Sequence, residues 1–339
     1  MQARYSESSW AVLAGLRFLL ASIVFIGHLQ FYMPLPQALQ WLPHAGGRAA
    51  VLGFLLISGI SVGHSYATRP MGYIQRRFLR IYPLYFFAVV GSAILNILIA
   101  AEATGPLLVV DWTVNVANLF FLQGFLSYTS PYNGALWSLG VEVFLYAMGP
   151  LLARASIGLL VVLIYLSLLA FFVPRQWLFG YLALRYSWPW LIGFLSATKG
   201  CPPLIFTFLG LGVLAVLLEN ADTTEVGSGF TFGMVAGAIL LLNTYAVTIP
   251  RFLRRIFNFL GELSYPLYLF HLPLSFALYH YLAVQNAAIF IVVVPLVSIL
   301  LNYLLDHWLK RIVWVPLVSW ASGLLAGGVS KFRRPEALQ

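Results

Sequence analysis

The sequence predicts an all-α, polytopic integral membrane protein of about ten transmembrane helices, with both termini in the cytoplasm. The first reason is composition: 61% of the 339 residues are hydrophobic and only 9% are charged. This leaves too little polar surface to cover a water-soluble globule of that size. The second reason is that apolar stretches near the roughly 20 residues that a bilayer requires recur along nearly the whole chain. The third is the distribution of basic residues between these stretches.

The apolar stretches are expected to cross the membrane in order along the chain. They are residues 10–32, 47–66, 81–101, 135–153, 156–173, 183–198, 203–219, 229–248, 256–281 and 288–309. The first is too long for a signal-peptide core and lacks a small-residue cleavage site, so we expect it to be retained. No stretch is left for a sizeable soluble domain. Residues 1–339 are therefore predicted to form one membrane-embedded domain, with 1–9 as a cytoplasmic N-terminus.

Basic residues alternate between the connections. Every second connection is rich in them: Arg69, Arg76, Arg77 and Arg80; Arg154; Lys199; Arg251, Arg254 and Arg255; and Lys310, Arg311, Lys331, Arg333 and Arg334. The intervening connections hold only Arg48, Arg175 and Arg185, alongside Asp111, Asp222 and Glu225. The positive-inside rule therefore places both termini in the cytoplasm, as an even number of spans requires. We attribute the net charge of +9 to this topology and to anionic lipid, not to nucleic acid.

Two apolar segments lie outside the predicted spans. The run from Val116 to Phe125 is too short to span, and we expect it to lie at or re-enter the outer surface, where it could cover an acceptor site. The tail after Arg311 is broken by Pro316 and several glycines. Residues 312–339 are therefore expected to form an interfacial or cytoplasmic tail, because an eleventh span would place the basic C-terminal run outside.

Arg17 and His28 lie eleven residues apart in the first span. At about 100° per residue this step returns to nearly the same helix face, and at about 1.5 Å per residue it separates the side chains by roughly 16 Å. A charged side chain at bilayer depth costs roughly 3 kcal/mol or more unless it faces protein or a water-filled cavity, so the pair indicates a functional pathway. The alternative is that Arg17 snorkels to the nearer surface and His28 only bonds a neighbouring helix.

Glu142 is predicted to share the outer half of the membrane with His28. It lies seven residues past Ala135, in a span that runs inward. Glu142 could then orient or charge-balance His28, while neutral His28 takes a proton from an incoming hydroxyl as general base. Alternatively, Glu142 only bonds Trp137 or Ser138 and joins helices together.

His271 is a further candidate, either functional or structural, near the middle of the ninth span. Pro266 and Pro273 flank it and are expected to free backbone carbonyls and shape a cavity. The other histidines lie near span ends without paired ligand spacing, and Cys201 is the only cysteine. We therefore expect neither a metal site nor a disulfide.

Arg76, Arg77 and Arg80 immediately precede the third span. Arg77 and Arg80 are three residues apart and share a helix face. Paired guanidinium groups bind phosphate oxygens bidentately, so a phosphate-bearing ligand could lie on Arg77 and Arg80 and extend past Arg17 towards His28. The alternative is that these arginines hold lipid headgroups at the positive flank of a span.

Five segments occur in an order that is typical of one family. They are LRFLLASIVFIGH, FLLISGISVGHSY, RRFLRIYPLY, LWSLGVEVFLY and LSYPLYLFHLP. In this order they resemble acyltransferase family 3, the integral-membrane glycan and lipid O-acyltransferases, from about residue 10 to 310. The resemblance implies a bundle of about ten spans, acyl-CoA used from the cytoplasm, and transfer of an acyl group, most often acetyl, to a sugar hydroxyl outside.

The resemblance carries over motif by motif. The Arg-x10-His motif falls on Arg17 and His28, the RxxR motif on Arg77 and Arg80, and the WSL..E motif on Trp137, Ser138 and Glu142. One departure is that Ala135 and Leu136 precede the WSL motif, where a polar residue or histidine often stands. The pantetheine arm of CoA is of the same order of length as the rise from Arg17 to His28, so the thioester could reach the outer half while the nucleotide stays at the cytoplasmic mouth.

Taken together, the sequence predicts a membrane-bound O-acyltransferase in the inner membrane of the cell. It is expected to move an acyl group, acetyl above all, from cytoplasmic acyl-CoA to a hydroxyl of an extracytoplasmic glycan or glycolipid. The expected roles are catalysis by His28 and Glu142, acyl-CoA binding by Arg17, Arg77 and Arg80, and acceptor binding by Trp137, Ser138 and His271. Two alternatives remain open: a transporter or flippase with an Arg, His and Glu relay, and a helical scaffold for an envelope-assembly partner.

Overall fold

The computed structural model describes residues 5–102, 112–173, 180–221, 225 and 227–332, with side chains to residue 323. The long helices are α1 (Glu7–Leu29), α2 (Gly47–Thr68), α3 (Tyr73–Glu102), α5 (Trp137–Arg154), α6 (Ile157–Phe171), α7 (Tyr181–Thr198), α8 (Pro202–Glu219), α9 (Ser228–Thr244), α10 (Arg251–His280), α11 (Ala287–Leu301) and α12 (Val315–Phe332). The shorter elements are α4 (Trp112–Leu119), the 3-10 helices η1 (Gln37–Leu39), η2 (Pro43–Ala45) and η3 (Gly134–Leu136), and the π-helix η4 (Asn302–Trp314). The described residues contain no strand, which confirms the all-α class.

Each predicted apolar stretch overlaps a helix of the structure, although several bounds differ by a few residues, as for 10–32 against α1 and 229–248 against α9. Six helical runs are long and apolar enough to cross a membrane: α1, α2, α3, η3 with α5 (Gly134–Arg154), α8, and α11 through α12 (Ala287–Gly323). Helices α6 and α9 are apolar but shorter. The protein is therefore an all-helical membrane protein, whereas the ten crossings and the cytoplasmic termini stay predictions.

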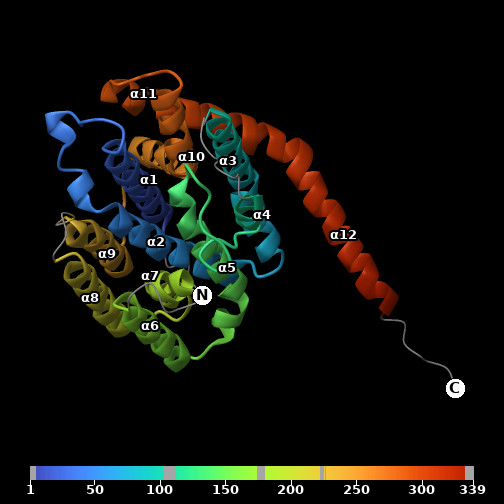
Figure 1. Cartoon of the computed structure of the whole chain (residues 1–339). Coiled ribbons are helices and arrows are strands. Elements are labelled where there is room, and N and C mark those ends of the chain that lie inside the picture. Colours follow the sequence, from blue (N-terminus) through green and yellow to red (C-terminus); the bar gives the residue numbers. More distant parts are fainter. Residues whose placement is uncertain (1–4, 103–111, 174–179, 222–224, 226, 333–339) are drawn as a thin grey trace.

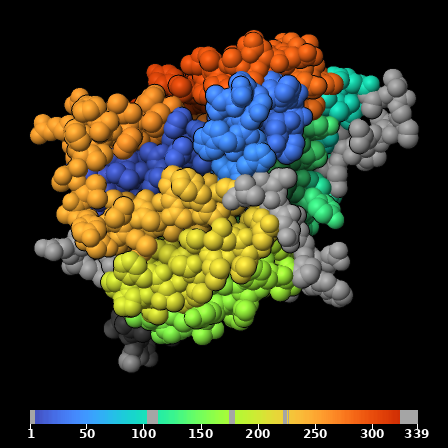
Figure 2. Space-filling view, turned by 90° about the vertical axis from the view of Figure 1, so that its left-hand side faces the viewer, coloured from blue at the N-terminus to red at the C-terminus, as the bar shows by residue number. Residues whose placement is uncertain are grey.

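Helix α2 lies at the centre of the bundle. It packs along α7 at two glycines: a Cβ at Gly59 would lie 2.0 Å from the carbonyl oxygen of Trp190, and one at Gly193 would lie 2.2 Å from that of Leu56. Small residues of this kind let the backbones of membrane helices approach closely. Helices α6, α8 and α9 lie on the side of this pair that faces away from α3 and α10 (Figure 1). The side view in Figure 2 shows the N-terminal segment in blue between the orange C-terminal segments and the yellow helices α8 and α9.

Helices α1 and α10 form the second close pair. A Cβ at Gly261 would lie 2.5 Å from the Cβ of Ala14. Pro273 has no N–H, so the carbonyl of Leu269 lacks its helical donor, and Nδ2 of Asn133 donates to that carbonyl at 3.0 Å. The predicted effect of this proline is thus seen, and it ties η3 and the start of α5 to α10.

The segment from Val116 to Phe125 exposes apolar side chains and buries polar ones. Val116 and Phe120 are exposed, as expected for a segment at the surface. Asn118 and Gln123 are fully buried, with Nε2 of Gln123 donating to the Leu136 carbonyl at 2.9 Å. That the segment lies at or re-enters the outer surface stays a prediction, and its buried polar side chains anchor it to the bundle next to η3.

The tail continues the last helix and extends away from the bundle as α12 (Figure 1). Nε2 of Gln75, near the start of α3, donates to Oγ of Ser322 at 2.7 Å. Whether α12 lies on the membrane surface stays a prediction. Of the charges used to predict the topology, Asp111, Arg175, Asp222, Arg333 and Arg334 lie outside the described residues, as does the side chain of Lys331.

Candidate active site

Two cavities lie within the helical bundle. The first, called the arginine cavity, has a volume of about 540 Å³ and is lined by Arg17, Arg77, Arg80, Ser138, Glu142 and Glu262, among others. The second, called the histidine cavity, has a volume of about 490 Å³ and is lined by His28, Phe31, Arg48, Trp137 and Tyr186, among others. Ligand sites typically have volumes of roughly 300–1,000 Å³. Val51 and Tyr268 line both cavities, so the two cavities adjoin.

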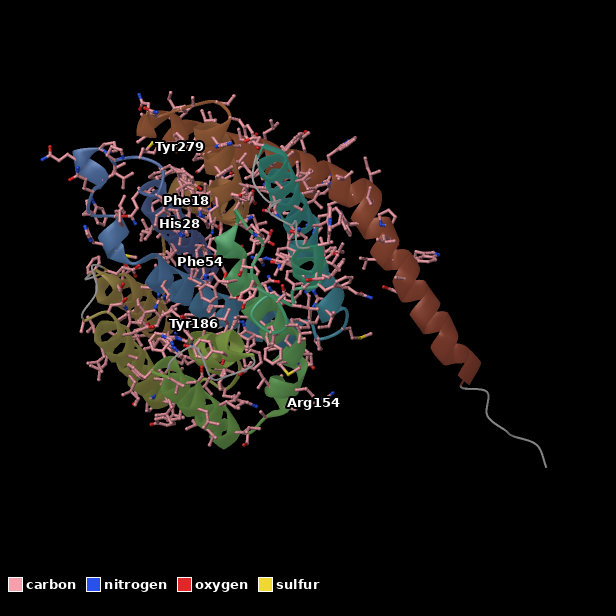
Figure 3. All side chains as sticks on the ribbon, viewed as in Figure 1. Phe18, His28, Phe54, Arg154, Tyr186 and Tyr279 are labelled. Carbon is pink, nitrogen blue, oxygen red and sulfur yellow. The ribbon has the colours of Figure 1, made fainter. Side chains whose placement is uncertain are left out.

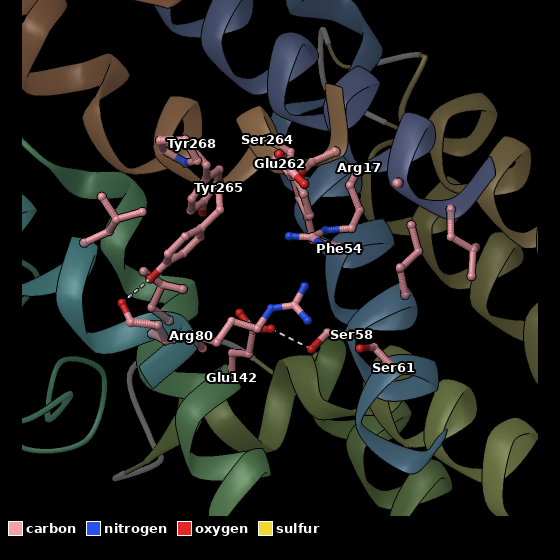
Figure 4. Close-up of a pocket in the computed structure, with 18 of the residues that line it drawn as sticks. Arg17, Phe54, Ser58, Ser61, Arg80, Glu142, Glu262, Ser264, Tyr265 and Tyr268 are labelled. Atoms are coloured by element: carbon pink, nitrogen blue, oxygen red, sulfur yellow. Dashed lines mark hydrogen bonds between the residues drawn. The ribbon is translucent and has the colours of Figure 1, made fainter. Parts of the chain in front are cut away.

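Charged side chains reach the arginine cavity from five elements: α1 (Arg17), α3 (Arg77 and Arg80), α5 (Glu142), α10 (Glu262) and η4 (Asp306). Arg17 comes from α1, Arg80 from α3 and Glu142 from α5, and the three side chains face one space (Figure 4). Arg77 is buried in the wall, where its Nη2 donates to the Ser61 carbonyl at 3.0 Å. Within the described part of the chain, no hydrogen bond or ion pair holds Arg17 or Arg80. These two guanidinium groups are therefore available to an anionic ligand.

Arg77 has a different environment from the other two arginines. Its guanidinium carbon lies 5.8 Å from the ring centroid of Tyr73 and 5.4 Å from that of Tyr146. Cation–π contacts of this kind, together with the bond to Ser61, fix the side chain. The structure thus brings together the three arginines predicted to bind acyl-CoA. Arg77 is held in place by the protein, whereas the N–H groups of Arg17 and Arg80 have no hydrogen-bond partner among the described residues.

Glu142 belongs to the arginine cavity. Its Oε1 accepts from Oγ of Ser58 and from Oη of Tyr146, each at 2.5 Å. The predicted pairing of Glu142 with His28 is wrong, and so is the alternative of a bond to Trp137 or Ser138. The reason is helical phase: α5 begins at Trp137, and a step of five residues displaces Glu142 by about 7.5 Å and rotates it by about 140°. Its position suits a negative charge balancing the free arginines.

His28 bonds a second histidine instead of an acid. Its Nδ1 lies 2.9 Å from Nε2 of His271, and the two ring planes are parallel to within 9°. His28 lies inside the bundle, towards the opposite end from Arg154 at the close of α5 (Figure 3).

The hydrogen-bond partners determine which ring nitrogen carries each proton. Nδ1 of His271 lies 2.8 Å from the carbonyl oxygen of Tyr268 and 3.2 Å from that of Leu267. A carbonyl only accepts, so this nitrogen must donate, which leaves Nε2 of a neutral His271 as an acceptor. Nδ1 of His28 is then the donor between the rings. Nε2 of His28 is left with a free lone pair, as a general base needs.

His271 itself is fully buried and is not among the residues that line either cavity. The prediction that it binds substrate directly is therefore corrected: among the described residues it contacts His28, not a cavity. The signal that indicates its place is local, because Tyr265, Tyr268 and His271 recur every three residues and so share one face of α10.

Trp137 and Ser138 point to different sides. Trp137 lines the histidine cavity, with its ring centroid 4.8 Å from that of Tyr186. Ser138 lines the arginine cavity, and its Oγ lies 2.8 Å from Oη of Tyr268. Consecutive helical residues are about 100° apart, which accounts for the split. Trp137 thus keeps a position suited to an acceptor, whereas Ser138 belongs to the wall between the cavities.

Arg48 has a role that its place in the sequence did not reveal, since there it bears only on topology. Nη1 of Arg48 donates to Oε1 of Glu219 at 3.0 Å, and the buried Arg185 donates to the same oxygen. Aromatic rings of Phe171 and Tyr181 flank Arg185 at 5.2 Å. The cation of the histidine cavity is therefore part of a paired charge network.

Metal ligands do not cluster in the described residues: no group of three or more His, Cys, Asp or Glu side chains is placed to hold an ion. Anions are a different matter. Arg17 and Arg80 suit an anionic ligand by charge, because guanidinium groups without hydrogen-bond or ion-pair partners among the described residues present several N–H donors to one space.

The fold and the site define a polytopic membrane protein with two adjoining polar cavities. Residues 10–322 match the family Acyl_transf_3, described as an acyltransferase domain. Because the match covers essentially the whole chain, the protein belongs to this family, and the resemblance carried by the five motifs is confirmed. Membership makes it a membrane acyltransferase. No curated protein and no solved structure matches the chain significantly.

Proposed function

We propose that the protein transfers an acyl group, acetyl above all, from acyl-CoA in the arginine cavity to a hydroxyl of a glycan or glycolipid in the histidine cavity. The observation that carries the proposal is the juxtaposition of two free guanidinium groups and a histidine with a free Nε2 on either side of one wall. In this proposal the arginine cavity opens to the cytoplasm and the histidine cavity to the outside of the inner membrane.

The donor is bound through its phosphates. Arg17 and Arg80 supply charge-assisted hydrogen bonds, which are shorter and stronger than neutral ones. The pantetheine arm then extends along the arginine cavity, and the thioester comes to the wall formed by Val51 and Tyr268. The nucleotide can remain at the mouth of the cavity throughout.

The acceptor is activated by His28. Its Nε2 takes the proton of the acceptor hydroxyl as the oxygen attacks the thioester carbonyl carbon. A C–O bond forms, the C–S bond breaks, and the leaving thiolate takes the proton back from His28, which releases free CoA with a thiol. His271 accepts from Nδ1 of His28 throughout, which keeps the ring in the required tautomer and orientation. Trp137 offers the acceptor an aromatic face in the same cavity.

The experiment uses purified protein, acetyl-CoA labelled in the acetyl group, and glycans and lipids extracted from membranes as acceptors. Wild-type protein is expected to release free CoA and to label the acceptor fraction, and His28→Ala to do neither. A transporter or flippase that uses Arg, His and Glu as a relay would leave the thioester intact. The proposal is therefore rejected if acetyl-CoA is bound but never cleaved with acceptors present.

A further inference from the structure

The arginine cavity and the histidine cavity adjoin at a wall whose side chains can be identified from the residues that line each cavity. Among the described residues, only Val51 of α2 and Tyr268 of α10 line both cavities. The two residues are 5% and 6% exposed. An acyl group that reaches His28 from the arginine cavity has to pass these two side chains.

The hydroxyl of Tyr268 forms hydrogen bonds to one residue from the lining of each cavity. It lies 2.8 Å from Oγ of Ser138, which lines the arginine cavity, and donates at 2.8 Å to the carbonyl of Ala135, which lines the histidine cavity. The ring packs at a tilt against Phe54 of α2, with centroids 5.6 Å apart. Two hydrogen bonds and one ring contact therefore hold the aromatic side chain across the passage.

The backbone of Tyr268 is held separately from its side chain. Its carbonyl accepts from Nδ1 of His271, the residue that orients His28. A movement of this backbone would disturb the catalytic pair, whereas rotation of the side chain breaks the bonds of the hydroxyl and the ring contacts with Phe54 and His271 but leaves the backbone bond in place. The side chain of Tyr268 is thus the part of the wall that can move while the hydrogen bond that holds His271 stays intact. Figure 4 shows Tyr268 at the edge of the arginine cavity, one turn beyond Tyr265 and Ser264 on α10.

We propose that Tyr268, latched by Ser138 and backed by Val51, is a gate between the two cavities that selects the acyl group by size. The selection of an acyl group rests on the proposed function, whereas the presence of a closed wall between the cavities does not depend on it. A small acyl group passes beside the ring, and each added methylene must displace Tyr268 or Val51 further. Discrimination by one methylene in an apolar passage is roughly 10- to 200-fold.

The first test measures the wall without acyl transfer. In a Cys201→Ser background, Ser61→Cys places a thiol in the arginine cavity and Gly134→Cys places one in the histidine cavity, where an added Cβ meets no atom within 4 Å. A small charged methanethiosulfonate is applied to each face of sealed vesicles. The face from which the Ser61→Cys thiol reacts defines the side of the arginine cavity.

From that face, the Gly134→Cys thiol is expected to react at least tenfold more slowly than the Ser61→Cys thiol. Tyr268→Ala or Val51→Ala is expected to remove most of that difference, and Tyr268→Phe, which lacks the latch, part of it. A Val143→Ala control, on α5 and among the lining residues of neither cavity, should leave it unchanged. Equal labelling of both thiols from that face in the parent protein would overturn the gate, whatever the outcome for acyl transfer.

The second test measures selectivity. The ratio of kcat/KM for hexanoyl-CoA to that for acetyl-CoA is expected to rise about tenfold or more in Val51→Ala and not in Val143→Ala. A wild-type protein that transfers no acyl group contradicts the proposed function and leaves the labelling result standing. A wild type that transfers acetyl, with an unchanged ratio in Val51→Ala and Tyr268→Ala, contradicts size selection by the gate.

Discussion

The arginine cavity and the histidine cavity differ in whether their arginines are paired with carboxylates. In the arginine cavity, Arg17 and Arg80 have no hydrogen-bonding or ion-pair partner in the described part of the protein, and the nearby Glu142 bonds Ser58 and Tyr146. In the histidine cavity, Arg48 is paired with Glu219, which also holds Arg185. Arg80 is exposed and Arg17 is partly buried, so both guanidinium groups are accessible to an anionic ligand. Arg185 is buried, and the carboxylate that pairs with it stabilises it within the protein. The contrast supports the proposal that an anionic donor is bound on one side of the wall and a neutral hydroxyl on the other.

The largest expected effect is on catalysis in the histidine cavity. His28→Ala should lower kcat by about 10²- to 10⁴-fold with little change in the KM for acetyl-CoA, because a general base acts on the acceptor and not on donor binding. The measurement is initial-rate kinetics of CoA release with acceptor present. His280→Ala, at the exposed end of α10 where the imidazole pairs with Glu102, is the matched control and should behave as wild type. A loss in both variants would contradict a specific role for His28.

The second effect is on stability, and it tests whether the arginines paired with Glu219 serve the fold and not ligand binding. Glu219→Gln leaves Arg185 buried without its carboxylate, and removing one member of a buried pair costs roughly 3–5 kcal/mol. We expect a clear drop in the thermal unfolding midpoint in detergent, and an unchanged KM for acetyl-CoA in the protein that remains folded. Glu7→Gln removes a surface pair with Arg254 and should shift stability by less than about 1 kcal/mol. Equal stability of the two variants would show that the histidine cavity does not depend on its charge network.

The third effect concerns the donor. Arg80→Ala should raise the KM for acetyl-CoA by roughly 10- to 150-fold, since a hydrogen bond to a charged group contributes about 1.5–3 kcal/mol. Arg76→Ala is the matched control, because Arg76 donates to the carbonyls of Met71 and Arg69 and is not among the residues lining the cavity. If both substitutions raise KM equally, the arginines act as a general positive flank and not as a site.

The smallest effect concerns the orientation of His28. In His271→Gln the amide oxygen can still accept from Nδ1 of His28, so we expect kcat to fall only a few-fold. In His271→Leu the acceptor is lost, and kcat should fall by a further 10-fold or more, of the order of one lost buried hydrogen bond. The KM for acetyl-CoA should stay unchanged in both. Equal activity of the Gln and Leu variants would mean that His271 only fills space.

Most of the fold could be predicted from the sequence, because the length and apolarity of each stretch are local properties. The gathering of Arg17, Arg77 and Arg80 was also predictable, since their motifs lie near one end of their spans. The partner of Glu142 was not. Its depth was counted from an expected span start at residue 135, whereas α5 begins at Trp137 after the turn of η3, and helical phase then carries Glu142 away from His28.

The histidine pair could not be predicted for a different reason. His28 and His271 are 243 residues apart and meet because α1 and α10 pack closely at Gly261 and Ala14. Nothing in the periodicity of either helix specifies which two faces meet. The spacing of Tyr265, Tyr268 and His271 indicates a shared face on α10, but only the packing shows that this face carries both the support of His28 and the wall between the cavities.

Direct binding of acetyl-CoA to purified protein, measured without acceptor, tests the central claim that donor and base occupy separate cavities. The account predicts wild-type affinity in His28→Ala and an affinity weaker by roughly 10-fold or more in Arg80→Ala. A loss of binding in His28→Ala as large as that in Arg80→Ala would contradict the separation, because the two side chains would then contact one ligand in one site.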